Sequence, residues 1–229
     1  MGAASLWLPA RALRAEAAWV RAKLAAIEAY GAILHRCAPT IQAREAKCAQ
    51  VQADTGAELV HPYTDPRVIA GQGTAAMELL GTAGTLDALV VPVGGGGLAS
   101  GTAIAARTLA PECHVFGAEP SGAADTFESL RRGEHVTDFI PDTICDGLRG
   151  TLGAPDFELL REHSVEVLTV EDADTVAAMR LLWQRMKLLV EPSSAIALAM
   201  VLGNRERFAG KRVGVILSGG NVDLDALPW

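Results

Sequence analysis

Four consecutive glycines, Gly94, Gly95, Gly96 and Gly97, form the segment of this sequence best suited to hold a ligand. They follow an apolar run over residues 89–93 and precede an expected helix start near Leu98. Without a Cβ atom the backbone can adopt positive φ and approach a ligand closely. The N–H groups of a helix start, together with the helix dipole, favour phosphate. A tight strand-to-helix turn explains the same residues, but a run of glycines after an apolar strand favours a phosphate site.

The glycine run does not by itself identify the ligand that carries the phosphate, and one candidate is a dinucleotide. Gly94, Gly96 and Ala99 match G-x-G-x-x-A, and Glu119 closes the next expected strand, residues 114–119. In a dinucleotide-binding βαβ unit, an acidic residue at that place binds a ribose hydroxyl. The glycine run therefore leaves a nicotinamide-dependent oxidoreductase open, and a second motif is needed to choose between ligands.

Composition sets the limits for the fold and for partners. The chain has 229 residues, of which 50% are hydrophobic and 21% charged, enough for one large or two small domains. A formal net charge of -7 argues against nucleic acid or an anionic membrane as a partner. The cysteines form no C-x-x-C pair, which favours reduced thiols and a cytoplasmic location. No apolar run approaches the length of a membrane span.

Strand-like and helix-like segments alternate along the chain. This pattern predicts an α/β fold with a doubly wound, mostly parallel sheet covered on both faces. Ligands in such folds bind at the carboxyl ends of the strands, where residues 94–97 and 218–221 both lie. The expected strands are 33–37, 89–93, 114–119, 165–170 and 213–217. The expected helices include 9–30, 40–56, 65–80, 125–132, 155–163, 172–190 and 193–207.

Local signals fix the ends of three of these helices. Gly31 follows the first helix in the position that favours a left-handed glycine. Pro39 and Thr40 suit the start of the second helix, and Gly56 its end. Asp65 followed by proline has the chemistry of an N-cap and a first helical residue.

Five motifs that occur in one order give the second line of argument. They are residues 68–74 (VIAGQGT), 90–98 (VVPVGGGGL), 118–121 (AEPS), 185–193 (RMKLLVEPS) and 217–223 (LSGGNVD). The combination resembles the fold-type II pyridoxal-phosphate enzymes, which are tryptophan synthase β-like, and in particular the serine racemase and serine/threonine dehydratase (ammonia-lyase) family. The resemblance extends from about residue 22 to the end of the chain.

The resemblance implies a set of cofactor-binding residues. The glycines and the amide of Leu98 would hold the phosphate, and the hydroxyl of Ser218 would face the pyridine nitrogen. A neutral hydroxyl there makes the ring a milder electron sink than an aspartate would. Tyr63 would contact the ring, and Glu191 would lie beside the pocket. Two alternatives stay open: Ser218 as a turn hydroxyl, and Glu191 as a helix-terminal carboxylate paired with Lys187.

The resemblance also implies a divalent-cation site. Glu119, the carbonyl of Ala123 and Asp125 match the family's metal ligands, and three hard oxygen ligands suit Mg²⁺, Mn²⁺ or Ca²⁺. A solvated acidic loop is the alternative. This role for Glu119 also competes with the ribose role.

Two segments of the family do not occur in this sequence. One is Ser-Phe-Lys-x-Arg-Gly-Ala, which carries the Schiff-base lysine, and the other is Ser-Ser-Gly-Asn-His-Gly, which holds the substrate. The lysines present, none of which lies in such a context, are Lys23, Lys47, Lys187 and Lys211. An imine needs an amine aimed at the cofactor, so we assign no catalytic residue and expect weak, non-covalent pyridoxal-phosphate binding.

The resemblance implies a domain division and an activity. Residues 1–21 are a divergent start, 22–61 a partial small domain, and 62–229 an incomplete cofactor-binding large domain. The family racemises serine, or eliminates water from serine or threonine to give a 2-oxo acid and ammonia, and we expect this chain alone to be impaired. Expected partners are a small amino acid and a second copy or a full-length family member.

Two other functions remain as alternatives to an impaired racemase or dehydratase. One is a non-catalytic partner of a full-length family member, which co-purification with an intact homologue would favour. The other is an NAD(P)-dependent oxidoreductase built on the glycine-rich βαβ unit. Residues 218–221 argue against the oxidoreductase, because such enzymes have no comparable need for them.

Overall fold

The computed structural model describes residues 18–38 and 41–229, which fall into two units. One unit holds the described residues up to Val60 together with Asn221–Trp229, and the other is His61–Gly220. The first unit contains helices α1 (Ala18–Ala29) and α2 (Ile41–Thr55).

The described part of the first unit agrees with some of the predictions. Gly31 and Gly56 follow α1 and α2 with φ of 80° and 68°, as predicted for left-handed helix ends. The expected cap at residues 39–40 lies outside the described residues. The expected strand at 33–37 is wrong: these residues are irregular, and no strand pairs with them in the described part of the chain.

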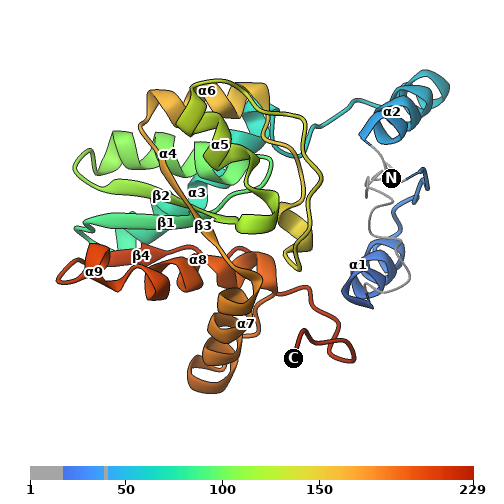
Figure 1. The fold of residues 1–229 in the computed structure, drawn as a ribbon. Coiled ribbons are helices and arrows are strands. Elements are labelled where there is room, and N and C mark those ends of the chain that lie inside the picture. Colours follow the sequence, from blue (N-terminus) through green and yellow to red (C-terminus); the bar gives the residue numbers. More distant parts are fainter. Residues whose placement is uncertain (1–17, 39–40) are drawn as a thin grey trace. The chain divides into compact units, whose positions relative to one another are not determined.

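The second unit is built on a parallel sheet of four strands in the order β3-β2-β1-β4 (Figure 1). The strands are β1 (Ala88–Pro92), β2 (His114–Pro120), β3 (Glu166–Val170) and β4 (Val213–Val215). All three neighbouring pairs run parallel. The predicted α/β fold is thereby confirmed, and the carboxyl ends of all four strands meet at one edge.

The strands are buried on both faces because their side chains alternate between two apolar cores. In β1 and the residue after it, Leu89, Val91 and Val93 belong to one core, whereas Ala88 and Val90 belong to the other. This is the burial expected for a parallel sheet between two helical layers. The edge that carries the glycine run is therefore held by packing from both sides.

Helices form the two layers (Figure 1). Helices α3 (Pro66–Ala83), α4 (Gly97–Leu109) and α6 (Ala154–Glu162) contribute side chains to the first core. Helices α7 (Asp172–Leu181) and α8 (Pro192–Gly203) contribute to the second. Two short connections, η2 (Ser121–Ala123) and η3 (Asp146–Leu148), and helix α5 (Asp125–Arg132) complete the carboxyl edge.

The motif at residues 68–74 lies in helix α3, and one of its glycines is required by a close contact with α4. The N-cap of α3 is Asp65, whose side chain accepts the N–H of Arg67 at 2.8 Å, as predicted. A Cβ on Gly73 would lie 2.7 Å from the carbonyl oxygen of Gly101 on α4, and a Cβ on Gly101 would collide with Ile69 O. The two helices therefore pack backbone to backbone, and this contact positions the helix that starts at the glycine run.

The expected long helix over residues 172–190 is shorter in the structure. Helix α7 passes into a π-helical turn, η4 (Leu182–Met186), which ends at Lys187 with φ of 59°. The indole Nε1 of Trp183 donates to Val190 O at 3.0 Å, so the chain folds back instead of continuing as a helix. The helix predicted over 193–207 is likewise divided, into α8 and α9 (Arg205–Phe208).

No helix among the described residues is both long enough and apolar enough to cross a membrane.

Candidate functional site

The four glycines lie in a densely packed loop between β1 and α4. A Cβ on Gly94 would lie 2.9 Å from the Cα of Leu148, and a Cβ on Gly97 would lie 2.9 Å from the Cα of Tyr63. A Cβ on Gly95 would collide with the Tyr63 ring. Only glycine fits these positions, which makes the loop a backbone cradle.

Gly96 has the special conformation in this loop. Its φ is 100°, which an L side chain adopts only with strain, and it is the N-cap of α4. No side chain caps this helix. The N–H groups of Gly97, Leu98 and Ala99 have no acceptor inside the helix because they belong to its first turn. The loop thus presents backbone donors and the positive end of a 13-residue helix, the chemistry that binds an anion.

Residues 145–153, a segment that the sequence analysis did not select, lie against the glycine loop. The N–H of Gly153 donates to Gly95 O at 3.0 Å. Gly147 and Leu148 contact the position of a Cβ on Gly94. The repeated glycines at 147, 150 and 153 were the available signal, since three glycines in one loop indicate close backbone approach.

Tyr63 lies at the glycine loop, as the resemblance implies for a ring-contacting residue. Its side chain packs against Gly95 and Gly97, and its ring meets that of His61 edge to face with centroids 4.5 Å apart. The imidazole Nδ1 of His61 accepts the N–H of Thr64 at 3.2 Å, which helps to fix this turn before α3.

Glu191 lies beside Gly219, the residue that follows Ser218 after the end of β4. The N–H of Glu191 donates to Gly219 O at 3.1 Å, and a Cβ on Gly219 would lie 2.6 Å from Glu191 Oε1. Ser218 itself is exposed. The ammonium of Lys187, the residue expected to pair with Glu191 in the alternative interpretation, donates to Gln184 O at 2.7 Å.

The expected metal ligands lie after β2, where two of them are buried carboxylates. Glu119 is fully buried, and its two oxygens accept the N–H groups of Thr126 and Phe127, each at 2.8 Å. Burial raises the pKa of Glu119 to about 8, against the lowering effect of those two donors, and the nearby Asp125 carboxylate adds to the rise. Both oxygens of Glu119 are therefore engaged by the first turn of α5.

The other two expected metal ligands, Ala123 and Asp125, are also buried. The Oδ2 atom of Asp125 accepts the N–H of Leu152 at 2.8 Å, and burial raises the pKa of Asp125 to about 6. Across residues 18–38 and 41–229 there is no group of three His, Cys, Asp or Glu side chains arranged to hold a metal ion. Any cation here would depend on the two carboxylates and backbone carbonyls.

Asp156 is a third buried carboxylate, which sequence reasoning missed. Its side chain lies against Gly96, where an added Cβ would be 2.5 Å from Asp156 Cβ. Its Oδ1 accepts the hydroxyl hydrogen of Ser100 at 2.9 Å, and no hydrogen-bond partner for Oδ2 occurs among the described residues. Burial raises the pKa of Asp156 to about 6. An aspartate early in a helix is ordinarily a capping residue, so nothing local marked it out.

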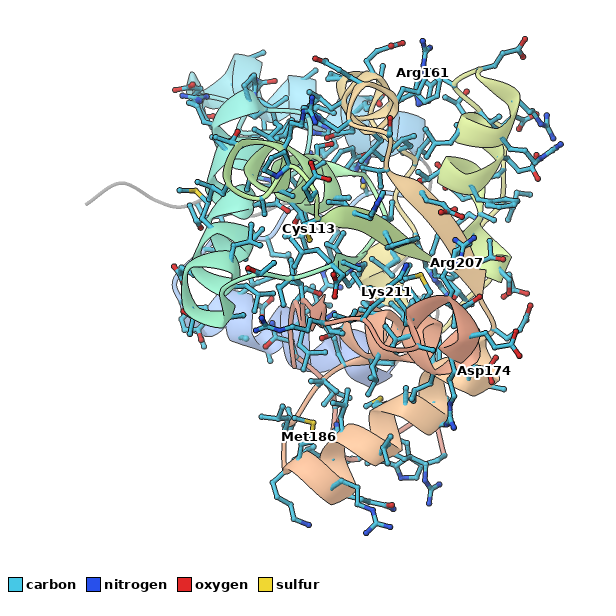
Figure 2. All side chains as sticks on the ribbon, turned by 90° about the vertical axis from the view of Figure 1, so that its left-hand side faces the viewer. Cys113, Arg161, Asp174, Met186, Arg207 and Lys211 are labelled. Carbon is cyan, nitrogen blue, oxygen red and sulfur yellow. The ribbon has the colours of Figure 1, made fainter. Side chains whose placement is uncertain are left out.

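The two lysines of the second unit lie away from the glycine loop. Lys211 precedes β4 and so belongs to the amino edge of the sheet, where Figure 2 shows it together with Cys113. Lys187 follows η4, and Figure 2 shows its neighbour Met186 at the end of that segment, away from the sheet. Neither ammonium group is positioned at the anion-binding end of α4.

Comparison with known proteins identifies the class of this site. Residues 3–219 match the family model described as "Pyridoxal-phosphate dependent enzyme". The chain therefore belongs to the pyridoxal-phosphate dependent enzyme family, and the cofactor that this family implies is pyridoxal phosphate rather than a dinucleotide.

Individual relatives confirm the resemblance to the serine racemase and dehydratase family. The β-hydroxyaspartate dehydratase of Paracoccus denitrificans is 49% identical over 209 residues, 91% of this chain and 66% of that protein. The crystal structure of serine racemase from Dictyostelium discoideum has a TM-score of 0.82 at 45% identity and covers 89% of this chain and 66% of its own. The crystal structure of the T.th. threonine deaminase has a TM-score of 0.83 at 42% identity and covers 88% and 67%.

The chain spans slightly less than two thirds of the length of the first curated relatives that it matches.

Proposed function

We propose that this chain binds pyridoxal phosphate with the phosphate in the glycine loop. The observation that carries the proposal is the loop itself. A Cβ at any of the four glycines would come within 3.0 Å of a neighbouring heavy atom, and the loop opens onto the uncapped start of α4. The N–H of Leu98 and its neighbours in the first turn would hold the phosphate by charge-assisted hydrogen bonds.

The other end of the cofactor would lie at the end of β4. Because β1 and β4 are neighbouring parallel strands, Ser218 and the glycine loop share the carboxyl edge of the sheet. The exposed hydroxyl of Ser218 is available to the pyridine nitrogen, Tyr63 to the ring, and Glu191 lies beside Ser218 through Gly219. When bound, the cofactor supplies an electron sink for chemistry at the α-carbon of an amino acid.

The reaction class follows from the relatives. We propose that the function belongs to an ammonia-lyase or racemase that acts on a small amino acid such as serine or threonine. A dehydratase of β-hydroxyaspartate, a serine racemase and a threonine deaminase all resemble this chain at 42–49% identity. The first and last of these activities remove a substituent from the β-carbon, and racemisation moves only the α-proton.

Covalent attachment of the cofactor is the step for which the second unit, His61–Gly220, offers no lysine at the glycine loop. Lys187 and Lys211 lie away from the glycine loop, as described above. We therefore propose that this chain binds the cofactor without a covalent bond and that its own catalysis is impaired.

A divalent cation is a further part of the proposal. Glu119 and Asp125 are two buried carboxylates, and the charge of Asp125 raises the pKa of Glu119. An opposite charge close to a buried carboxylate favours its ionised form, so a cation between the two would offset the rise in their pKa values. With the carbonyl of Ala123, they form an oxygen set suited to Mg²⁺, Mn²⁺ or Ca²⁺, which would order the turn between β2 and α5.

The cofactor proposal is tested by comparing pyridoxal phosphate with pyridoxal in equilibrium dialysis. Pyridoxal lacks the phosphate, so we expect its affinity to be lower by about tenfold or more, the effect of losing charge-assisted hydrogen bonds. Equal affinity for the two compounds would show that the glycine loop is not the binding site.

Covalent attachment is tested on the same samples. After borohydride reduction, mass spectrometry is expected to find no single lysine labelled in stoichiometric amount. Stoichiometric labelling at one lysine would contradict non-covalent binding, and it would do so whichever compound binds more tightly.

A further inference from the structure

A buried carboxylate lies directly behind the proposed phosphate cradle. Asp156 is the third residue of α6 and is fully buried. Its side chain contacts Gly96, the residue at which α4 begins, and its Oδ1 accepts from Ser100 in the first turns of that helix. A phosphate bound at the glycine loop and the carboxylate of Asp156 would therefore both lie at the start of α4.

The two oxygens of this carboxylate are unequally satisfied. Oδ1 has the hydroxyl of Ser100 at 2.9 Å, whereas Oδ2 is buried beside Gly153 without a hydrogen-bond partner in the described part of the chain. A buried charged oxygen without a donor is costly. Protonation removes the charge and turns Oδ2 into a hydroxyl group, so the neutral form suits this position better.

An anion in the cradle adds a second reason for protonation. The positive end of α4 stabilises one negative charge, and the phosphate and an ionised Asp156 would compete for it. Two negative charges close together in a desolvated site raise the pKa of the weaker acid. Binding of the anion is thus linked to the charge of Asp156.

We propose that Asp156 takes up one proton from solvent when an anion binds to the glycine loop, so that the affinity of the cradle for phosphate falls as the pH rises. This inference rests on the proposed cofactor site and gives it a pH-sensitive positioning residue. The proton is taken up at the carboxylate, and no bond of the ligand is made or broken.

The direction of the effect follows from the charge of the free protein. Burial already raises the pKa of Asp156 to about 6. Below that pH the carboxyl is neutral and the anion binds without proton uptake. Above it each binding event requires a proton, and the dissociation constant rises by up to about tenfold per pH unit.

Other titratable groups surround Asp156, and their proton uptake has to be distinguished from its own. The groups in direct contact with Asp156, from Gly96, Ser100 and Gly153, do not titrate. Through Leu152 the neighbours are Asp125 and His135, the latter with Nε2 2.7 Å from Leu152 O. The remaining groups are Tyr63 at the glycine loop and Glu158 and Arg161 on α6 itself.

The test uses sulfate as the probe, because its charge does not change between pH 5.5 and 8. Sulfate binding to the whole chain is measured by isothermal titration calorimetry in buffers of different ionisation enthalpy, which counts protons. We expect the wild-type chain to take up close to one proton at pH 7. Its dissociation constant should rise as the pH increases from 6 to 8. The same titrations with pyridoxal phosphate should show the same trend.

Two substitutions identify the residue that takes up the proton. Asp156→Asn keeps the size and the acceptor for Ser100 without the charge, so we expect its proton uptake to be lost and its affinity to be independent of pH. Glu158→Gln makes the same change of charge on the same helix at an exposed side chain and should behave as wild type. If Asp156→Asn does not fold, His135→Gln serves instead, and retained uptake in this variant excludes the histidine.

The outcomes separate this inference from the proposed function. Binding of sulfate and pyridoxal phosphate with no proton uptake at pH 7, or uptake that persists in Asp156→Asn, would overturn the role of Asp156 and leave the cofactor site standing. No binding of either compound at any pH would overturn the cofactor site and the role of Asp156 with it.

Discussion

The loop after β1 and the loop after β4 lie on the same edge of the sheet but are built differently. In the glycine loop, an added Cβ on Gly94 or Gly97 meets the Cα atom of another residue at 2.9 Å. In the loop after β4, the nearest atom to an added Cβ on Gly219 is the carboxylate oxygen of Glu191, at 2.6 Å. The neighbour is backbone at Gly94 and Gly97 and the end of a flexible side chain at Gly219, whereas at Gly220, the next residue of the loop after β4, it is again backbone, Leu189 O.

This difference assigns the two loops different parts in ligand binding. Gly94 and Gly97 meet backbone that cannot move aside, so we expect the fold to fix the position of a phosphate bound there. Ser218 is exposed, so we expect its proposed contact with the ring to be adjustable. The contacts to the phosphate should therefore determine whether the ligand binds, and the contacts at the end of β4 should determine how strongly its ring withdraws electrons.

The largest expected effect comes from a methyl group in the glycine loop. Gly96→Ala places a side chain at φ of 100° and 2.5 Å from the Cβ of Asp156. Strain and overpacking together should lower the free energy of unfolding by about 3 kcal/mol and abolish pyridoxal-phosphate binding. Urea unfolding and equilibrium dialysis measure the two effects.

Two matched substitutions sharpen this comparison. Gly219→Ala should cost about 1 kcal/mol or less, because the Glu191 carboxylate can move away. Gly71→Ala, where a Cβ on α3 has nothing within 4 Å, should stabilise the chain by up to about 1 kcal/mol. Equal destabilisation by Gly96→Ala and Gly219→Ala would remove the contrast between the two loops.

Cation binding at the loop after β2 should have an effect of intermediate size. At ten times its dissociation constant, Mg²⁺ or Mn²⁺ bound at Glu119 and Asp125 should stabilise the chain by roughly 1.4 kcal/mol. Asp125→Asn should remove most of this gain, as measured by the melting temperature with and without the cation.

The control for the metal test lies on the same helix. Glu128 is a carboxylate of α5 that pairs with Arg131 at 2.6 Å and Arg132 at 2.9 Å. Glu128→Gln should leave the cation-induced shift in melting temperature unchanged. If Asp125→Asn keeps the full shift, the cation binds elsewhere.

The smallest expected effect is that of Ser218→Ala. Because the side chain is exposed, its removal should change the free energy of unfolding by less than about 0.5 kcal/mol. Loss of one hydrogen bond to the ring should weaken pyridoxal-phosphate binding by about two- to tenfold. If the hydroxyl faces the ring nitrogen, as proposed, the absorbance of the bound cofactor should also shift. An unchanged affinity and spectrum would place the ring away from β4.

Some features could be predicted from sequence because their causes are local. Asp65 and Gly31 mark helix ends through single-residue backbone chemistry, and both are confirmed. The expected strand at 33–37 is wrong because a strand also needs a partner, which sequence pattern does not supply. The helix predicted over 172–190 ends early because Trp183 bonds to Val190 O, a contact that periodicity does not reveal.

The buried carboxylates show the same limit at the candidate site. Glu119 was selected from its place after a strand, but its full burial and the two N–H groups that it accepts were not foreseeable. Asp156 was not selected at all. Its partner Ser100 is 56 residues away in sequence, and the contact forms only because α4 and α6 pack on the same face of the sheet.

The sequence by itself determined the alternation of strands and helices, and with it the parallel sheet and the edge at which we propose that the cofactor binds. It also determined the glycine loop, because only glycine permits that backbone to approach so closely. The tertiary structure alone decided which acidic groups lose their water, and so which of them respond to a nearby charge. Desolvation depends on what packs around a residue, and those neighbours come from distant parts of the chain.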